Sequence, residues 1–315
     1  MLRTNIAKKI FHSMEYAGIM CLYAVLGVLP IKYIYMFAKF LGMCSFYCLR
    51  IRRNATMANL RRALGNELNE ADLKKIARDA YINIGMTFVE MLFIFNMKTR
   101  IADMVDMSDI IYIKKHLELK RGLIFVSCHF GSWELNGAAL AAYGIPITVV
   151  AKRQSNPYID RFISKSRTEF GMKVIPHGAP VKHIVRALRN HEAVGLISDQ
   201  DAGKKGIFIN FFGSKASTPQ GAAQLAMKYD VPIVVVVTVR IRPGYNKSIF
   251  KEIDVRNDDT VEILTQRYTK IMEDIIRRHP EQYFWMHRRW KTSPPEKDFP
   301  HEKNESYGTS QGIVA

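Results

Sequence analysis

A histidine and a glutamate follow the end of an apolar run. Residues 123–134 read LIFVSCHFGSWE, so His129 and Glu134 come directly after the apolar segment. Imidazole titrates near neutral pH, and a nearby carboxylate orients the ring and stabilises its charged form, so the pair is suited to general-base catalysis. The spacing H-x4-E has little specificity by itself, because a surface histidine and a glutamate in a first helical turn give the same pattern.

The elements around the pair decide whether the two side chains can meet. On one regular helix, residues five apart point about 140° away from each other. If 123–128 is a strand, Gly131 permits a sharp turn, Ser132 caps the next helix and Glu134 falls in its first turn, where the helix dipole favours a carboxylate. We therefore expect His129 and Glu134 to converge at the carboxyl end of the strand, where open α/β sheets bind ligands.

Short β-branched runs alternate with helical stretches from about residue 120 onward. The predicted strands are 123–128, 145–151, 193–198, 233–240 and 249–255. The predicted helices are 133–143, 157–170, 181–190, 219–229, with Thr218 as its N-cap, and 261–278. Near-continuous apolar strands separated by helices predict an α/β fold with a mostly parallel central sheet flanked by helices.

The N-terminal part of the chain has a different character. Residues 16–49 are almost entirely apolar, and basic residues lie on both sides of them. The longest uncharged run is slightly short of the roughly 20 residues of a spanning helix, so a single span, a re-entrant pair and an interfacial anchor stay open, as does a buried helical hairpin in a soluble protein. We predict a membrane anchor over 1–52, an α/β domain over 53–294, with a long helix capped by Asn69, and a polar, disordered tail over 295–315.

The charge of the chain restricts its partners. Lys and Arg number 46 against 29 Asp and Glu, a formal charge of +17, which favours phosphates, anionic lipid surfaces or an acidic protein. The sequence contains no RNP, helix-turn-helix or zinc signature, so we expect no nucleic acid. It contains no Walker loop, no G-x-G-x-x-G and no Cys/His metal spacing, so we expect no cofactor and no metal. Cys128 and His129 point to opposite faces of a strand, which argues against a thiol–imidazole dyad.

Four blocks together resemble a known family. They read HFGSWELNGAAL, VVAKRQSNPYIDRFISKSRTEFGMKVI, AVGLISDQDAGKKGIFINFFGSKASTPQGAAQLA and HPEQYFWMHRRWK. In this order and spacing they resemble the bacterial lipid A biosynthesis acyltransferases of the late, or secondary, lauroyl and myristoyl type. That family belongs to the lysophospholipid acyltransferase superfamily and is related to phosphatidylinositol mannoside acyltransferases.

The resemblance implies a reaction and roles for particular residues. The family's H-x4-D/E motif matches His129, as the general base that deprotonates an acceptor hydroxyl, and Glu134, as the residue that orients the imidazole. The implied donor is an acyl carrier protein thioester and the implied acceptor is a phosphorylated glycolipid, a lipid A precursor, at the bacterial inner membrane with the catalytic domain facing the cytoplasm. The family's blocks also match Arg167, Asp199, Gln200 and Asp201, expected to bind substrate, and the strand-end segment KRQSNP adds Arg153 and Asn156 as phosphate ligands.

Two other interpretations stay open. One is a member of the same family that acylates another lipid, such as a phosphoinositide mannoside or an aminoacyl lipid. The other, from a different class, is a non-catalytic basic protein that binds membranes or nucleic acid. The sequence leaves the acyl chain length, the acylated hydroxyl and the oligomeric state undetermined.

Overall fold

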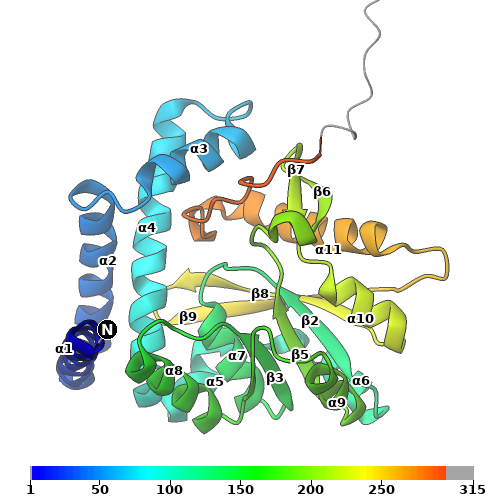
Figure 1. Cartoon of the computed structure of the whole chain (residues 1–315), viewed down its shortest axis with the longest axis horizontal. Coiled ribbons are helices and arrows are strands. Elements are labelled where there is room, and N and C mark those ends of the chain that lie inside the picture. Colours follow the sequence, from blue (N-terminus) through cyan, green and yellow to red (C-terminus); the bar gives the residue numbers. More distant parts are fainter. Residues whose placement is uncertain (1, 296–315) are drawn as a thin grey trace, which may run out of the picture.

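A seven-stranded sheet forms the centre of the structure (Figure 1), a computed structural model that describes residues 2–295. Its spatial order is β1-β9-β8-β2-β5-β3-β4. The bounds are β1 (Val105–Asp106), β2 (Leu123–Ser127), β3 (Ile147–Ala151), β4 (Lys173–Pro176), β5 (Ala193–Ile197), β8 (Ile233–Arg242) and β9 (Tyr245–Ile253). Strands β8, β2, β5, β3 and β4 run parallel, whereas β9 returns antiparallel to β8. The predicted α/β fold with a mostly parallel sheet is confirmed.

Helices cover both faces of the sheet (Figure 1). They are α5 (Ile101–Met104), α6 (Ile111–Glu118), α7 (Trp133–Ala142), α8 (Pro157–Glu169), α9 (Lys182–Arg189), α10 (Gly221–Tyr229) and α11 (Val261–Arg278), with 3-10 turns η1 (Ile94–Arg100), η2 (Ser108–Ile110), η3 (Gly203–Lys205) and η4 (Pro280–Gln282). Side chains of β2 alternate between two apolar clusters: Ile124 and Val126 pack in one, Leu123 and Phe125 in the other. This burial on both faces explains why β2 is apolar at nearly every position.

Four helices precede the sheet: α1 (Leu2–Val28), α2 (Ile31–Tyr47), α3 (Arg53–Leu64) and α4 (Glu70–Phe93). Asn69 caps α4 as predicted, its side chain accepting from the Asp72 amide at 3.0 Å. Helices α2 and α4 touch through glycines, since a Cβ on Gly42 would lie 2.4 Å from the Tyr81 carbonyl oxygen. One face of α2 is therefore buried in the protein, and the opposite face exposes large apolar side chains. These are Tyr33, Met36, Phe40, Met43 and Tyr47.

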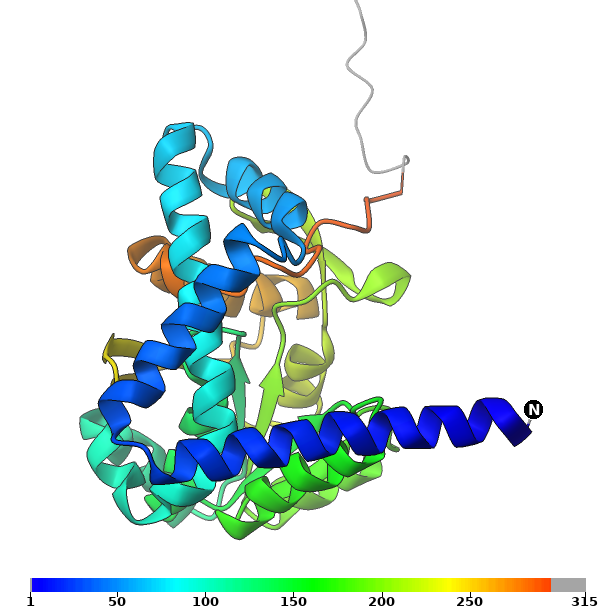
Figure 2. The ribbon, with the colours of Figure 1, turned by 90° about the vertical axis from the view of Figure 1, so that its left-hand side faces the viewer.

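Helix α1 lies along one side of the domain, and its N-terminal end projects beyond it (Figure 2). The stretch Ile6–Val28 is long and apolar enough to cross a membrane, with a mean hydropathy of 1.3, and only 6% of its most apolar window is buried. The same helix contacts α8 through the ring pair Tyr16–Tyr158, 5.8 Å between centroids. The N-terminal apolar segment of the prediction is thus two helices that meet at Pro30.

Some elements differ from the prediction. Residues 207–218 form a hairpin, β6 (Ile207–Phe211) and β7 (Ser214–Thr218), whose turn residues Phe212 and Gly213 both have positive φ. Thr218 therefore ends a strand, and α10 begins at Gly221 instead of after a Thr218 cap. The edge strands β1 and β4 were also missed, because a strand of two or four residues shows no periodicity. The predicted tail, from residue 296 on, lies outside the described residues.

Candidate active site

Two neighbouring parallel strands bring His129 and Asp199 together. Strands β2 and β5 pair in register as far as Ser127 and Ile197, and the Ser198 amide donates to the Ser127 carbonyl at 2.9 Å. The residues that follow each strand therefore meet at the same edge of the sheet. The His129 Nδ1 atom lies 2.8 Å from Asp199 Oδ1, and the His129 backbone N–H donates to Asp199 Oδ2 at 3.1 Å. One carboxylate thus fixes both the ring and the backbone of His129.

The charges of this pair support each other. Burial lowers the pKa of His129, but the Asp199 carboxylate outweighs burial and, with a smaller contribution from Glu134, leaves the pKa of the imidazole raised. Burial raises the pKa of Asp199, but the contacts with His129 outweigh this and leave it lowered. Asp199 therefore stays ionised, accepts the Nδ1 proton and leaves Nε2 as the basic nitrogen of the neutral ring.

The sequence analysis assigned the orienting role to Glu134, and the structure places Asp199 in hydrogen-bond contact with the ring. Glu134 instead pairs with Arg167 of α8: Arg167 Nη2 lies 2.6 Å from Glu134 Oε1 and Nε lies 3.1 Å from Oε2. Both side chains are mostly buried, with 17% and 15% exposed. A bidentate guanidinium occupies both carboxylate oxygens. Burial opposes the charge of Arg167, but Glu134 outweighs it and raises the pKa of the guanidinium.

The turn between His129 and α7 requires glycine. Gly131 has a φ of +53°, and a Cβ there would lie 2.0 Å from the Thr238 carbonyl oxygen. The Gly131 amide donates to the Gln282 carbonyl at 2.9 Å, and the Phe284 amide donates to the His129 carbonyl at 3.0 Å. The segment 282–284 therefore holds the turn from a distant part of the chain. Ser132 lies at the N-cap position of α7 without the predicted capping bond.

Aromatic and amide groups surround the imidazole. The His129 ring lies edge-on to Trp133, 5.3 Å between centroids, and 6.0 Å from Phe284. Gln200 Nε2 lies 3.4 Å from each ring nitrogen, so its amide is beside the ring. The His129 side chain keeps 23% of its surface exposed, which leaves the ring open to a substrate.

An apolar pocket begins beside this site and extends between the sheet and α7. Its lining includes Trp133, which contacts the His129 ring, and the ion-paired Glu134 and Arg167. The apolar part of the lining comes from β2, β3, β5, α7 and the loop before β4, and includes Phe125, Leu140, Ile147, Val149, Met172, Gly195 and Leu196. A mostly apolar pocket with one charged pair in its lining suits an amphiphilic chain.

Two further residues predicted to bind substrate have structural partners. Asp201 accepts from the Gly203 amide at 2.9 Å and from the Thr292 hydroxyl at 2.9 Å, so it ties a loop to the C-terminal segment. Asn156 caps α8 by accepting from the Tyr158 amide at 3.0 Å, and it donates to the His12 carbonyl of α1 at 2.8 Å. Both polar atoms of the Asn156 side chain are therefore hydrogen-bonded within the protein.

Two arginines from the quoted sequence blocks differ in their exposure. Arg153 is exposed on the loop after β3. Arg289, within the block HPEQYFWMHRRWK, is buried and donates to the Ser217 carbonyl and the Thr218 hydroxyl at 2.5 Å each. Cys128 is buried, and burial together with the Asp199 charge raises the pKa of its thiol well above the ordinary value, so the thiol stays protonated.

Among residues 2–295, no group of three or more His, Cys, Asp or Glu is arranged to hold a metal ion.

The fold and the site define a class of α/β enzyme in which an imidazole–carboxylate pair at the sheet edge lies beside an apolar pocket. Comparison with known proteins identifies the family. The model of the bacterial lipid A biosynthesis acyltransferases matches residues 5–292, and the chain belongs to this family. The protein is therefore an acyltransferase that acts on a lipid acceptor.

Several characterised relatives share most of the chain. A lipid A biosynthesis palmitoleoyltransferase of Escherichia coli is 28% identical over 250 residues, which cover 78% of this chain and 81% of the relative. A lipid A biosynthesis lauroyltransferase of the same organism is 27% identical over 272 residues, covering 84% and 88%. A phosphatidylinositol mannoside acyltransferase of Mycolicibacterium smegmatis is 24% identical over 195 residues, covering 61% and 64%.

Proposed function

We propose that this acyltransferase transfers a fatty acyl chain from an acyl carrier protein thioester to a hydroxyl of a lipid A precursor. One observation carries the proposal: the partly exposed His129 ring packs edge-on against Trp133, which lines an apolar pocket. The pocket fits the acyl chain of the donor, and this position sets the thioester carbonyl next to the imidazole. A non-catalytic basic protein has no use for this arrangement.

The proposed mechanism uses His129 as base and then as acid. Nε2 removes the proton from the acceptor hydroxyl while the hydroxyl oxygen forms a bond to the thioester carbonyl carbon. The tetrahedral intermediate collapses, the carbon–sulfur bond breaks, and the leaving thiolate takes the proton from the imidazolium. Asp199 holds the Nδ1 proton throughout and stabilises the charged ring, which is the role of the buried carboxylate in a catalytic triad.

Glu134 and Arg167 have a separate part in this mechanism. Their bidentate pair lines the pocket, and in the proposed mechanism the acceptor headgroup and the thioester meet beside it. The two hydrogen bonds to Glu134 hold the Arg167 guanidinium in one geometry. The remaining N–H groups of Arg167 are left for the substrate. In the proposed mechanism Arg167 binds the acceptor, and Glu134 fixes Arg167 and adds to the basicity of His129.

The charge and the N-terminal helices agree with the proposed partners. Acyl carrier proteins are acidic and the acceptor is phosphorylated, so a formal charge of +17 attracts both. A hollow next to α3 is lined by Arg50, Arg52, Arg53, Lys74 and the ion pair Arg61–Glu70, and its net positive charge offers a contact surface for an anionic partner. We propose that α1 and the exposed face of α2 attach the protein to the bacterial inner membrane, with the α/β domain on the cytoplasmic side.

A second acceptor is supported by one of the comparisons. The mycobacterial relative is named for acylation of a phosphatidylinositol mannoside, so a mannosylated phosphoinositide is the alternative acceptor. Both acceptors present a sugar hydroxyl near a phosphate, and the same chemistry at His129 serves either one.

The test measures acyl transfer by membranes that contain the protein. Wild-type and His129→Ala proteins are incubated with an acyl carrier protein thioester and either a lipid A precursor or a phosphatidylinositol mannoside, and mass spectrometry identifies the product. We expect an acylated lipid A precursor with the wild type and a loss of about 10³-fold or more in His129→Ala. Near-wild-type turnover by a folded His129→Ala protein refutes the general base, and acylation of the mannoside alone refutes the acceptor.

A further inference from the structure

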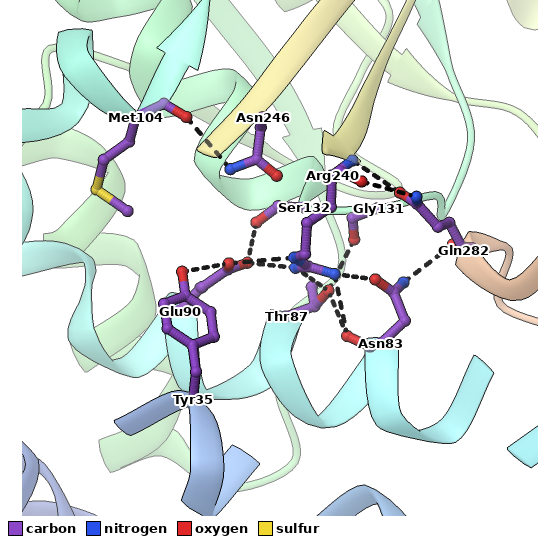
Figure 3. A network of polar contacts seen from close by, with 10 residues as sticks. All are labelled: Tyr35, Asn83, Thr87, Glu90, Met104, Gly131, Ser132, Arg240, Asn246 and Gln282. Atoms are coloured by element: carbon purple, nitrogen blue, oxygen red, sulfur yellow. Dashed lines mark hydrogen bonds and ion pairs between the residues drawn. The ribbon is translucent and has the colours of Figure 1, made fainter. Parts of the chain in front are cut away.

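A buried charged cluster lies behind the turn that carries His129 (Figure 3). Glu90 of α4 and Arg240 of β8 form an ion pair, with Arg240 Nη2 at 2.5 Å from Glu90 Oε2. The Arg240 side chain is 5% exposed and the Glu90 side chain 2%. A buried ion pair is weak support for stability, because apolar residues of similar volume are often as good or better. The contacts of the cluster indicate what else it does.

The Glu90 carboxylate is fully occupied (Figure 3). Its Oε1 atom accepts from the Tyr35 hydroxyl at 2.7 Å and from Arg240 Nε at 3.3 Å. Its Oε2 atom accepts from Arg240 Nη2 and from the Ser132 hydroxyl, both at 2.5 Å. A carboxylate has about four lone-pair directions, so each of its positions has a donor. The Ser132 bond connects the carboxylate directly to the catalytic turn.

Arg240 reaches the same turn by two other routes. Its Nη2 atom donates to the Thr87 hydroxyl at 3.1 Å, and that hydroxyl donates to the Gly131 carbonyl at 2.7 Å. Its backbone N–H and carbonyl both bond to the Gln282 side chain, at 2.8 and 3.0 Å. Because the Gln282 carbonyl accepts from the Gly131 amide, both peptide groups of Gly131 are fixed by residues that contact Arg240.

We propose that Glu90 and Arg240 are positioning residues for the acyl-transfer reaction: they hold the turn 129–132 so that His129 stays on Asp199 and faces the acyl pocket. The proposal rests on the proposed function, since it assigns these residues to the reaction of that site. A displacement of about 1 Å of a reacting group can cost about 10²-fold in rate, so a fixed turn matters to the reaction more than to the fold.

The network also reaches the N-terminal helices. Tyr35, which donates to Glu90, lies on the buried face of α2, the helix whose outer face exposes large apolar side chains. One carboxylate therefore contacts both α2 and the catalytic turn. The position of the turn depends on how α2 packs against α4.

The first experiment replaces the carboxylate in Glu90→Gln. The amide nitrogen cannot accept from Ser132 and Arg240, so the turn loses one of its anchors. We expect kcat for acyl transfer to fall about tenfold to a hundredfold with KM for the thioester unchanged. NMR titration of the His129 ring is expected to give a lower pKa than in the wild type, because the ring moves away from the Asp199 charge.

Asp259→Asn is the matched control. Asp259 is buried and pairs with Arg267 at 3.1 Å near the start of α11, and its carboxylate also accepts from the Arg256 amide. This variant loses a buried ion pair that has no part in the turn. We expect a lower melting temperature with kcat and the His129 titration unchanged. If Asp259→Asn lowers kcat and the His129 pKa as Glu90→Gln does, general destabilisation explains the effect and the proposal is wrong.

A second pair of variants decides the question if Glu90→Gln does not fold. Thr87→Val removes the bond to the Gly131 carbonyl at nearly constant volume, and Thr87→Ser restores the hydroxyl. We expect Thr87→Val to lower kcat and the His129 pKa, and Thr87→Ser to recover most of both. Folded Glu90→Gln or Thr87→Val protein with the kcat and His129 titration of the wild type overturns the proposal. The NMR measurement needs no substrate, so it separates this outcome from a failure of the proposed function, in which the wild type itself transfers no acyl chain.

Discussion

Replacing Asp199 by asparagine tests the central contact of the site. Asp199 accepts two bonds from His129, one from the ring at 2.8 Å and one from the backbone N–H at 3.1 Å. Asparagine has one acceptor oxygen, so one of the two His129 donors loses its partner. The substitution also removes the charge that raises the pKa of His129, while the burial that lowers this pKa remains.

The size of the effect follows from the geometry. Opposite unit charges about 4 Å apart interact by about 4 kcal/mol at an effective dielectric constant of 20, and each 1.4 kcal/mol or so corresponds to a factor of ten in rate. We therefore expect Asp199→Asn to lower kcat by about 10³-fold, close to the roughly 10⁴-fold effect of the same change in a serine protease triad. In the wild type, the raised pKa of His129 places the acidic limb of the pH–rate profile above the ordinary histidine value, and in Asp199→Asn it moves to lower pH.

The assay is acyl transfer from an acyl carrier protein thioester across a series of pH values, on variants whose folding is checked by circular dichroism. Asp201→Asn is the control, because Asp201 lies two residues away and its carboxylate binds Gly203 and Thr292. We expect Asp201→Asn not to shift the acidic limb of the pH–rate profile. A folded Asp199→Asn protein with kcat within about tenfold of the wild type, or with an unmoved acidic limb, refutes the assignment of Asp199 as the partner of His129.

Three other substitutions have definite expected outcomes. Gly195→Val adds atoms to the pocket wall, where a Cβ on residue 195 would lie 3.3 Å from Val149 Cγ1. Competition between donors should therefore shift to shorter chains by about fourfold in kcat/KM per methylene lost. An unchanged chain preference contradicts a pocket that holds the acyl chain. Asn156→Ala removes a helix cap worth about 1 kcal/mol and should lower the melting temperature with KM unchanged, whereas a raised KM supports a substrate contact. Gly131→Ala forces a Cβ onto the Thr238 carbonyl at positive φ and should cost at least about 3 kcal/mol in a denaturation experiment, and wild-type stability contradicts the geometry of the turn.

The sequence predicted the sheet and the place of the site because both depend on local patterns. Long apolar runs such as 123–127 and 233–239 are buried on both faces, and the end of a parallel strand locates a ligand site from one strand alone. Short strands have no such signal. The β6–β7 hairpin could have been recognised from Gly213, a turn residue between the short runs IFINF and SKAST.

The partner of His129 could not be read from spacing. The motif points to Glu134, five positions away, but Asp199 lies 70 positions away in sequence and reaches the ring through strand pairing. The position of Asp199 at the end of a predicted strand indicated only that it lies at the same edge of the sheet as His129. Glu90 and Arg240 lie outside the quoted motifs, but the sequence does mark them. Each is a single charge within an apolar run, TFVEMLF and VVVVTVRI. A lone charge in a buried segment needs a partner, and here each is the partner of the other.

The two edges of the sheet have a consequence for how the protein behaves when many copies are crowded together. An exposed edge strand presents unpaired backbone groups that can recruit a strand from another molecule. Here β1 is only two residues long and pairs only with Asn246 and Lys247 of β9, so the rest of β9, with the exposed Lys251 and Glu252, forms part of this edge. The other edge is β4, whose four residues begin with Lys173 and end with Pro176. Charged side chains and a proline on an edge disfavour pairing with a neighbouring sheet, so we expect crowding not to lead to strand exchange between copies.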